Sequence, residues 1–173
     1  MIKKQIEDIK LKGAIAKLPI TDPDKFIVEV NLNSNETVLV LDANMVVGSL
    51  HVISAYEHAQ RAFRTNRART KNVKLETLIY IAGTTQIGMA LNKLKLKAGQ
   101  KEMILVFFGN DWTDNKITDF LKIMNLSSDD TLLEKELLKK LKNFGITENE
   151  LKNITEERTT DIILEKVAFV DIL

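Results

Sequence analysis

Apolar side chains recur at helical spacing through the middle of the chain. The pattern predicts a helix from about Leu50 to Phe63, with Ser49 placed to cap its start. A second helix is expected over Leu75–Ala82, where one face is apolar throughout. A third is expected over Ile87–Leu94. Asn72 is placed to cap the second helix and Gly83 to end it, so Gly83-Thr84-Thr85 forms the turn into the third.

Three other segments have the patterns of strands. Residues 25–33 alternate between apolar and polar side chains, and residues 37–41 form a short apolar run. The Asn-Ser-Asn at 33–35 indicates a hairpin between them. Glu102–Phe108 is the most apolar short run and predicts a buried central strand.

The last third of the chain is expected to be helical. One helix is predicted over Ile117–Met124 and another over Leu133–Phe144, which ends at Gly145. Thr147-Glu-Asn-Glu150 has the pattern of a capping box, and a final apolar element starts at about Thr160. The fold predicted is α/β (α+β), a single domain over residues 1–173 with a small mixed or antiparallel sheet surrounded by many helices.

Composition narrows the classes of protein. With 173 residues, 45% of them apolar, the chain is long enough for one stable core. It has no cysteine, which excludes disulfides, thiolate metal sites and thiol nucleophiles. No signal peptide and no apolar run of membrane-spanning length is found. We therefore expect a soluble, cytoplasmic protein without membrane contact.

Charge is strongly segregated along the chain. The segment from His58 to Lys101 contains ten basic residues and one acid, Glu76, and so carries about +9, whereas the whole chain carries +1. A basic surface attracts polyanions, so the segment indicates contact with nucleic acid. The alternative is a solvated helix face whose arginines serve solubility.

The Gly83–Gly88 segment has the glycine spacing of a phosphate-binding loop but lacks its chemistry. A Walker A loop continues with Lys and with Ser or Thr, and here Met89 and Ala90 follow. An NTPase is thereby excluded. The free N–H groups of Gly83-Thr84-Thr85 remain able to hold a phosphate or a base edge, or one of the threonines simply caps the next helix.

No catalytic or metal constellation can be assembled from the sequence. His51 and His58 have no acidic or cysteine neighbours at metal-ligand spacing, and we expect His58 to face solvent. The aspartates lie in turn or capping contexts, and no Gly-x-Ser-x-Gly motif occurs. We therefore predict no catalytic residue, no metal and no cofactor.

The C-terminal element is apolar around most of its circumference. A helix that packs only on its own domain needs one apolar stripe. The element is therefore either fully buried or docks on a partner by a second face, and the partner is favoured because chain ends tend to be peripheral. A strand over Val167–Leu173 is a third alternative.

Four blocks of the sequence together resemble one known family. In chain order they are Leu41–His51 followed by Ala55 and Ala59, then Leu75–Ile87, then Ala90 and Leu91, and finally Thr160–Ile172. In order and spacing they resemble the small kinase-binding subunit of the KEOPS complex, the TPRKB-like family. The resemblance covers most of residues 38–173.

The resemblance implies a non-catalytic role. KEOPS installs threonylcarbamoyl-adenosine in tRNA, and the subunit in question binds and regulates the kinase/ATPase of the complex and recruits tRNA by its 3′ CCA end. The tRNA-binding residues expected here are His51, Arg61, Arg64, Arg67, Arg69, Lys71, Lys74, Gly83, Thr84, Thr85, Gln86 and Ile87. The residues expected to bind the kinase, all on the C-terminal helix, are Ile163, Val167 and Val170.

Two other classes remain open at this point. One is a standalone nucleic-acid-binding domain without a kinase partner. The other is a small-molecule enzyme that uses the Gly83 loop.

Overall fold

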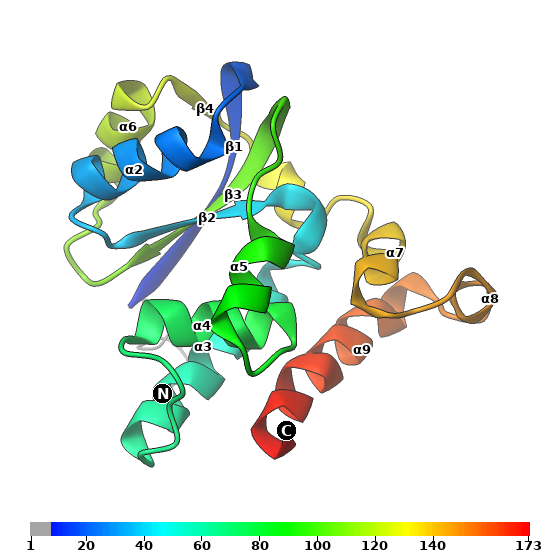
Figure 1. The fold of residues 1–173 in the computed structure, drawn as a ribbon. Coiled ribbons are helices and arrows are strands. Elements are labelled where there is room, and N and C mark those ends of the chain that lie inside the picture. Colours follow the sequence, from blue (N-terminus) through cyan, green and yellow to red (C-terminus); the bar gives the residue numbers. More distant parts are fainter. Residues whose placement is uncertain (1–7) are drawn as a thin grey trace. The chain divides into compact units, whose positions relative to one another are not determined.

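The computed structural model describes residues 8–173 and has an α+β architecture (Figure 1). Within those residues it contains a four-stranded antiparallel sheet and eight α-helices. The expected class, with a small antiparallel sheet and many helices, is confirmed. The chain forms two compact units, which we call unit 1 (up to Ala43, and Lys95–Leu133) and unit 2 (Asn44–Leu94 and Glu134–Leu173). The single domain expected over residues 1–173 stays a prediction.

Unit 1 is built on the sheet. Its strands are β1 (Ile9–Ile20), β2 (Val38–Asp42), β3 (Gln100–Phe108) and β4 (Leu126–Ser128). They lie in the order β2-β3-β1-β4, and every neighbouring pair is antiparallel. The central position predicted for β3 is confirmed, and its residues 103–107 are fully buried. Two short 3-10 helices, η1 (Ala43–Met45) and η2 (Asp130–Leu133), follow β2 and β4.

Strand β1 was not expected from the sequence because, apart from Ile9, its buried residues are small. Ala14 and Ala16 lie in the core, and Gly13 has no side chain to show a pattern. At Gly13 the backbone of Asp129 comes so close that an added Cβ would clash with the Asp129 carbonyl oxygen. The Asp129 N–H donates to the Gly13 carbonyl over 2.8 Å. Glycine therefore permits the chain after β4 to cross this strand.

The strand predicted over residues 25–33 is wrong, because this segment forms helix α2 (Pro23–Ser34). The carboxylate of Asp22 accepts a hydrogen bond from the Lys25 N–H over 3.1 Å, and proline occupies the first helical turn. The expected hairpin at 33–35 is a helix end, where Asn35 adopts the left-handed conformation with φ 51°. Phe26 and Val30, four residues apart, point into the core, a spacing that also fits alternation along a strand.

Helices α2 and α6 (Asp114–Ile123) cover the same face of the sheet (Figure 1). The core that they share with the strands includes Phe26 and Val30 from α2 and Ile117 and Phe120 from α6. The helix expected near 117–124 is thereby confirmed. Phe120 of this helix belongs to a cluster of rings packed edge to face, in which the ring centre of Phe107 lies 4.8 Å from that of Trp112 and 5.6 Å from that of Phe120.

Unit 2 is helical in the described residues. Its α-helices are α3 (Ser49–Arg64), α4 (Val73–Ala82), α5 (Ile87–Leu94), α7 (Leu137–Lys140), α8 (Glu148–Leu151) and α9 (Glu156–Phe169). The first three are the helices predicted from the spacing, and both caps predicted for α4, Asn72 and Gly83, are present. Ser49 is the first helical residue of α3 and not its cap, a position that Gly48 occupies. Helix α3 packs against α4 and α9.

The long helix expected over 133–144 is broken into shorter pieces. Within that range, helix α7 and the 3-10 helix η3 (Leu141–Phe144) begin only after Glu136, whose φ of 51° lies in the left-handed region and interrupts the helix. Gly145 ends η3 as expected. The capping box at Thr147 and Glu150 is present in α8. The last element is a helix that continues into the 3-10 turn η4 (Val170–Ile172), so the alternative of a strand is wrong.

Candidate functional site

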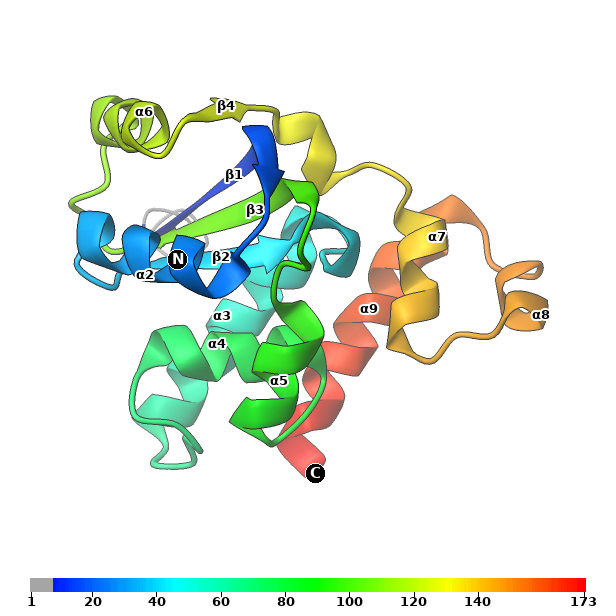
Figure 2. The same ribbon diagram turned by 45° about the horizontal axis from the view of Figure 1, so that its top comes forward.

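Six of the ten basic residues of the 58–101 segment lie on or next to the connection between α3 and α4, which is drawn in teal and green in Figure 2. Arg61 and Arg64 lie in the last turn of α3, where a cation interacts favourably with the helix dipole. The exposed members of this group are Arg61, Arg64, Arg67, Arg69 and Lys71, and Lys74 is half-buried. We call these six residues the basic surface. All six are among the residues that the sequence predicted to bind tRNA, and that role stays a prediction.

One acid determines the course of this connection. The Glu76 side chain is fully buried, at 0% exposure. Its carboxylate accepts hydrogen bonds from the Arg69 N–H over 3.0 Å and from the Thr70 N–H over 2.9 Å, and the Thr70 hydroxyl donates over 2.7 Å. The backbone of the connection is therefore wrapped around a buried negative charge. The sequence showed Glu76 only as the single acid in a basic segment.

The turn that leaves α3 is also fixed by the backbone. Asn66 adopts the left-handed conformation with φ 56°, and the Arg67 N–H donates to the Ala62 carbonyl over 2.8 Å. Together with the contacts of Glu76, this holds the backbone on both sides of the exposed arginines. The side chains of the basic surface project from a defined scaffold.

A second carboxylate joins the C-terminal turn to α3 and α4. Asp171, in η4, accepts a hydrogen bond from the Tyr80 hydroxyl over 2.5 Å, and its other oxygen lies 2.7 Å from His58 Nδ1. The rings of His58 and Tyr80 stack with centroids 5.4 Å apart. Arg69 donates from Nη2 to the Val170 carbonyl over 3.2 Å. We call His58, Arg69, Tyr80 and Asp171 the C-terminal clamp.

The clamp changes the acidity of its members. Burial raises the pKa of the Tyr80 phenol to about 12, and the hydrogen bond to Asp171 and the charge of that carboxylate act in the same direction. The pKa of the Asp171 carboxyl is held below its ordinary value. Burial acts to raise it, but the hydrogen bonds from Tyr80 and His58, together with the charges of His58 and Arg61, outweigh burial. His58 therefore has a partner, contrary to the expectation of a solvent-facing side chain.

The Gly83 loop follows directly from the end of α4. Gly83 has φ 74°, and its N–H donates to the Ile79 carbonyl over 3.0 Å. The Thr84 hydroxyl accepts a hydrogen bond from the Gln86 N–H over 3.3 Å. Thr84 therefore organises the turn into α5, which agrees with the alternative that a threonine has a structural role at the start of this helix. Gln86 is exposed, whereas Gly83, Thr84, Thr85 and Ile87 are half-buried.

Lys93 places a cation next to this loop. Its Nζ donates to the Ala82 carbonyl over 3.0 Å and lies 4.3 Å from the ring centre of Phe144. Burial and, to a smaller extent, the charge of Lys166 lower the pKa of the Lys93 amine. The sequence placed Lys93 in the basic segment but gave no reason to associate it with the loop.

His51 lies in the core and not at a surface. It is fully buried, its Nδ1 accepts from the Val47 N–H over 3.0 Å, and its Nε2 lies 3.0 Å from the Ile81 carbonyl. These contacts correspond to a neutral ring with the proton on Nε2, and burial lowers the His51 pKa to about 3. His51 is thus buried in this structure, and the RNA contact expected of it stays a prediction. Here the ring supports the last turn of α4, from which the Gly83 loop departs.

The stripe expected to dock on a kinase also faces inward. Ile163, Val167 and Val170 have exposures of 0%, 1% and 0% and form the buried side of the C-terminal helix. Their spacing correctly identified one helical stripe, but a stripe alone does not say which side of the helix meets the core. The exposed apolar side chains of this end are Phe169, Ile172 and Leu173, at 56%, 74% and 62%. We call these three the apolar tip.

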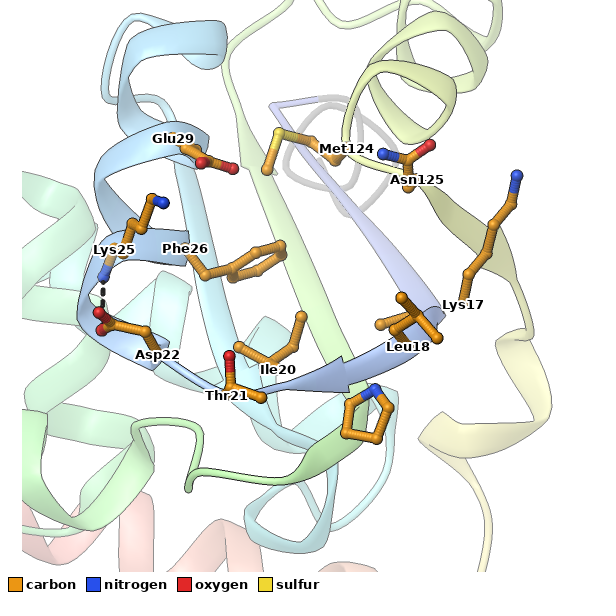
Figure 3. Close-up of a pocket in the computed structure, with 12 residues that line it drawn as sticks. Lys17, Leu18, Ile20, Thr21, Asp22, Lys25, Phe26, Glu29, Met124 and Asn125 are labelled. Atoms are coloured by element: carbon orange, nitrogen blue, oxygen red, sulfur yellow. Dashed lines mark hydrogen bonds between the residues drawn. The ribbon is translucent and has the colours of Figure 1, made fainter.

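Unit 1 contains an open pocket of about 490 Å³ (Figure 3). Its lining includes the apolar side chains of Phe26, Ile20 and Met124 and the charged side chains of Lys17 and Glu29. Asp22 also lines the pocket, and its carboxylate caps α2. Among residues 8–173 no group of three or more His, Cys, Asp or Glu side chains is placed to hold a metal ion. Nor does any helix there have the length and apolarity needed to span a membrane.

Comparison with known families identifies one match. The model of a family described as "Kinase binding protein CGI-121" matches residues 15–171, nearly the whole chain. No curated protein matches the sequence.

The clamp predicts a late titration of Tyr80. The difference in tyrosinate absorbance between the wild-type protein and Tyr80→Phe should have a midpoint near pH 12, compared with 10 for an ordinary tyrosine. Because the folded pKa is raised, the stability that Tyr80 contributes should be complete below pH 10 and lost as the pH rises through about 12. Asp171→Asn should lower the midpoint by removing the neighbouring charge. A midpoint near 10 in the wild-type protein would contradict the clamp.

Proposed function

Because the chain belongs to the family of the kinase-binding protein CGI-121, we propose that it is a non-catalytic accessory subunit of the KEOPS complex. In this role it docks on the kinase/ATPase of the complex, regulates it, and recruits tRNA by the 3′ CCA end. Kinase binding is the property that the family description itself carries. The recruitment of tRNA is supported by the basic surface, which is the observation that carries the RNA part of the proposal.

The basic surface is suited to the phosphate backbone of RNA. Five of its six side chains are exposed, so they can reach phosphates without a rearrangement of the core. The one acid within the segment, Glu76, is buried and turned toward the backbone N–H groups of Arg69 and Thr70. Its charge is therefore directed away from the surface. Contacts with phosphates position an RNA but carry no sequence information, which suits a subunit that serves several tRNAs.

We assign the single-stranded 3′ end to the Gly83 loop. The half-buried Gly83, Thr84, Thr85 and Ile87 and the exposed Gln86 offer backbone and amide groups to base edges. Lys93 adds a cation at the neighbouring Ala82 carbonyl. Single-stranded ends are the part of an RNA whose bases are free to be contacted in this way.

We assign the kinase contact to the apolar tip in place of the buried stripe. Three large apolar side chains, Phe169, Ile172 and Leu173, are exposed within five residues at the end of α9. Exposed apolar groups that cluster in this way are typical of protein interfaces. The buried stripe instead attaches the helix to unit 2.

Reversal of charge on the basic surface should weaken RNA binding. Arg64→Glu with Arg67→Glu should weaken binding of all tRNAs alike, because the lost contacts are to phosphates. The slope of log affinity against log salt should become shallower by about 1.4, at about 0.7 for each lost contact on a single strand. Filter binding or fluorescence anisotropy over a salt series measures both quantities.

Two controls separate the parts of this prediction. Lys152→Glu reverses an exposed charge of unit 2 outside the basic surface and should leave the salt slope unchanged. Removal of the terminal CCA from the tRNA should weaken binding more than a change in the anticodon. If trimmed and intact tRNA bind equally well, the assignment of the 3′ end to the Gly83 loop is wrong.

A charge placed on the apolar tip should weaken kinase binding. Ile172→Glu should leave the melting temperature nearly unchanged, because the side chain is exposed. It should weaken kinase binding at least about 30-fold, because an unpaired charge at an interface costs about 2–5 kcal/mol. Leu50→Glu, at another exposed apolar position of unit 2, is the matched control and should bind normally. Val167→Glu should instead unfold the protein or lower its stability strongly. Normal kinase binding by a folded Ile172→Glu protein would remove the apolar tip from the interface.

A further inference from the structure

The C-terminal clamp connects the two surfaces assigned above. Asp171 lies between Phe169 and Ile172 of the apolar tip, and it is held by His58 of α3 and Tyr80 of α4. Arg69, a member of the basic surface, holds the adjacent Val170 carbonyl. The same short turn therefore carries the apolar tip on one side and contacts the scaffold of the basic surface on the other.

We propose that the Asp171 carboxylate is a positioning residue that makes kinase docking and RNA binding mutually favourable. The inference rests on the proposed function and assigns to it a means of regulation. The element with two states is the turn η4, which is either attached to α3 and α4 through Asp171 and the Val170 carbonyl or detached from them.

The direction of the effect follows from what each ligand must hold in place. A kinase on the apolar tip immobilises Phe169 and Ile172, and so favours the attached turn between them. The attached turn accepts the Arg69 guanidinium and thereby restrains the end of the connection that carries the basic surface. RNA that binds afterwards has less of that connection to order, which gives positive cooperativity. By linkage, RNA must raise the affinity for the kinase by the same factor.

The side chains of the clamp are sufficiently enclosed to transmit this effect. The side chain of His58 is 15% exposed and that of Asp171 36%, so their interaction is only partly screened by solvent. The Tyr80 ring is almost completely buried and stacks on His58, which fixes the donor on the α4 side. Both donors lie on helices that pack against each other and against α9.

The test is a thermodynamic cycle with the full-length protein. The affinity for an intact tRNA is measured with the kinase subunit absent and then at a saturating concentration. In the wild-type protein the kinase should raise RNA affinity at least about fivefold, the lower end of usual coupling between sites. Asp171→Asn keeps the size of the side chain but removes its charge, and it should reduce the ratio to nearly one.

A matched variant and a second site distinguish coupling from general damage. Asp161→Asn makes the same chemical change at an exposed position of α9 and should retain the wild-type ratio. Tyr80→Phe removes one donor to Asp171 and should reduce the ratio in part. A loss of stability alone would weaken each binding separately without changing the ratio.

Each outcome decides the matter. A wild-type protein that binds both ligands with a ratio near one, or an Asp171→Asn protein that keeps the full ratio, would overturn the inference while leaving the proposed function intact. A wild-type protein that fails to bind the kinase or tRNA in the separate titrations would overturn the proposed function, and the inference with it.

Discussion

The buried carboxylate of Glu76 fixes the α3–α4 connection, and the features assigned to RNA binding depend on it. Two backbone N–H groups and one hydroxyl donate to this single side chain. Hydrogen bonds to a charged group contribute about 1.5–3 kcal/mol each, and a buried carboxylate without them would be strongly unfavourable. The connection therefore closes around Glu76 before any contact with a ligand is made. The surrounding arginines and Lys71 are left exposed on a backbone that is already ordered.

Asp171 performs a similar role at the C-terminal end of unit 2. It collects donors from α3 and α4, and the neighbouring Val170 carbonyl accepts from Arg69. Glu76 thus holds the backbone of the connection directly, whereas Asp171 holds the two helices that the connection joins. The middle of the sequence is strongly basic, and the few acids that contact it, Glu76 and Asp171, both lie where they hold helices or backbone together. This placement makes the basic character compatible with a stable fold.

Local signals were sufficient to predict several elements. Asn72 and Gly83 define both ends of α4, and the box formed by Thr147 and Glu150 defines the start of α8. The run at 102–108 was long and apolar enough to identify the central strand. For the two helices the determining hydrogen bonds join residues only a few positions apart in the sequence. For the strand, burial is so complete that the apolar run alone identifies it.

The remaining features depend on contacts between distant segments. Apart from Ile9, strand β1 is buried through small residues, and the role of Gly13 is visible only against the backbone of Asp129. The inward direction of Val167 and the burial of His51 depend on which elements surround them. The same holds for Glu76, Lys93 and the Asp171 clamp, whose partners no periodicity or spacing identifies. The sequence therefore locates the basic surface but not the interactions that hold it.

The most direct measurement is the affinity of Glu76→Gln for tRNA. Removal of a negative charge from a basic segment should by simple electrostatics tighten the binding of a polyanion. If Glu76 organises the connection, the amide instead leaves a buried donor unsatisfied, at a cost of about 1–3 kcal/mol, and RNA affinity and melting temperature should both fall. Glu57→Gln removes a charge near the same surface and should not weaken binding. Equal or tighter binding by a Glu76→Gln protein of unchanged stability would contradict the role assigned to this carboxylate.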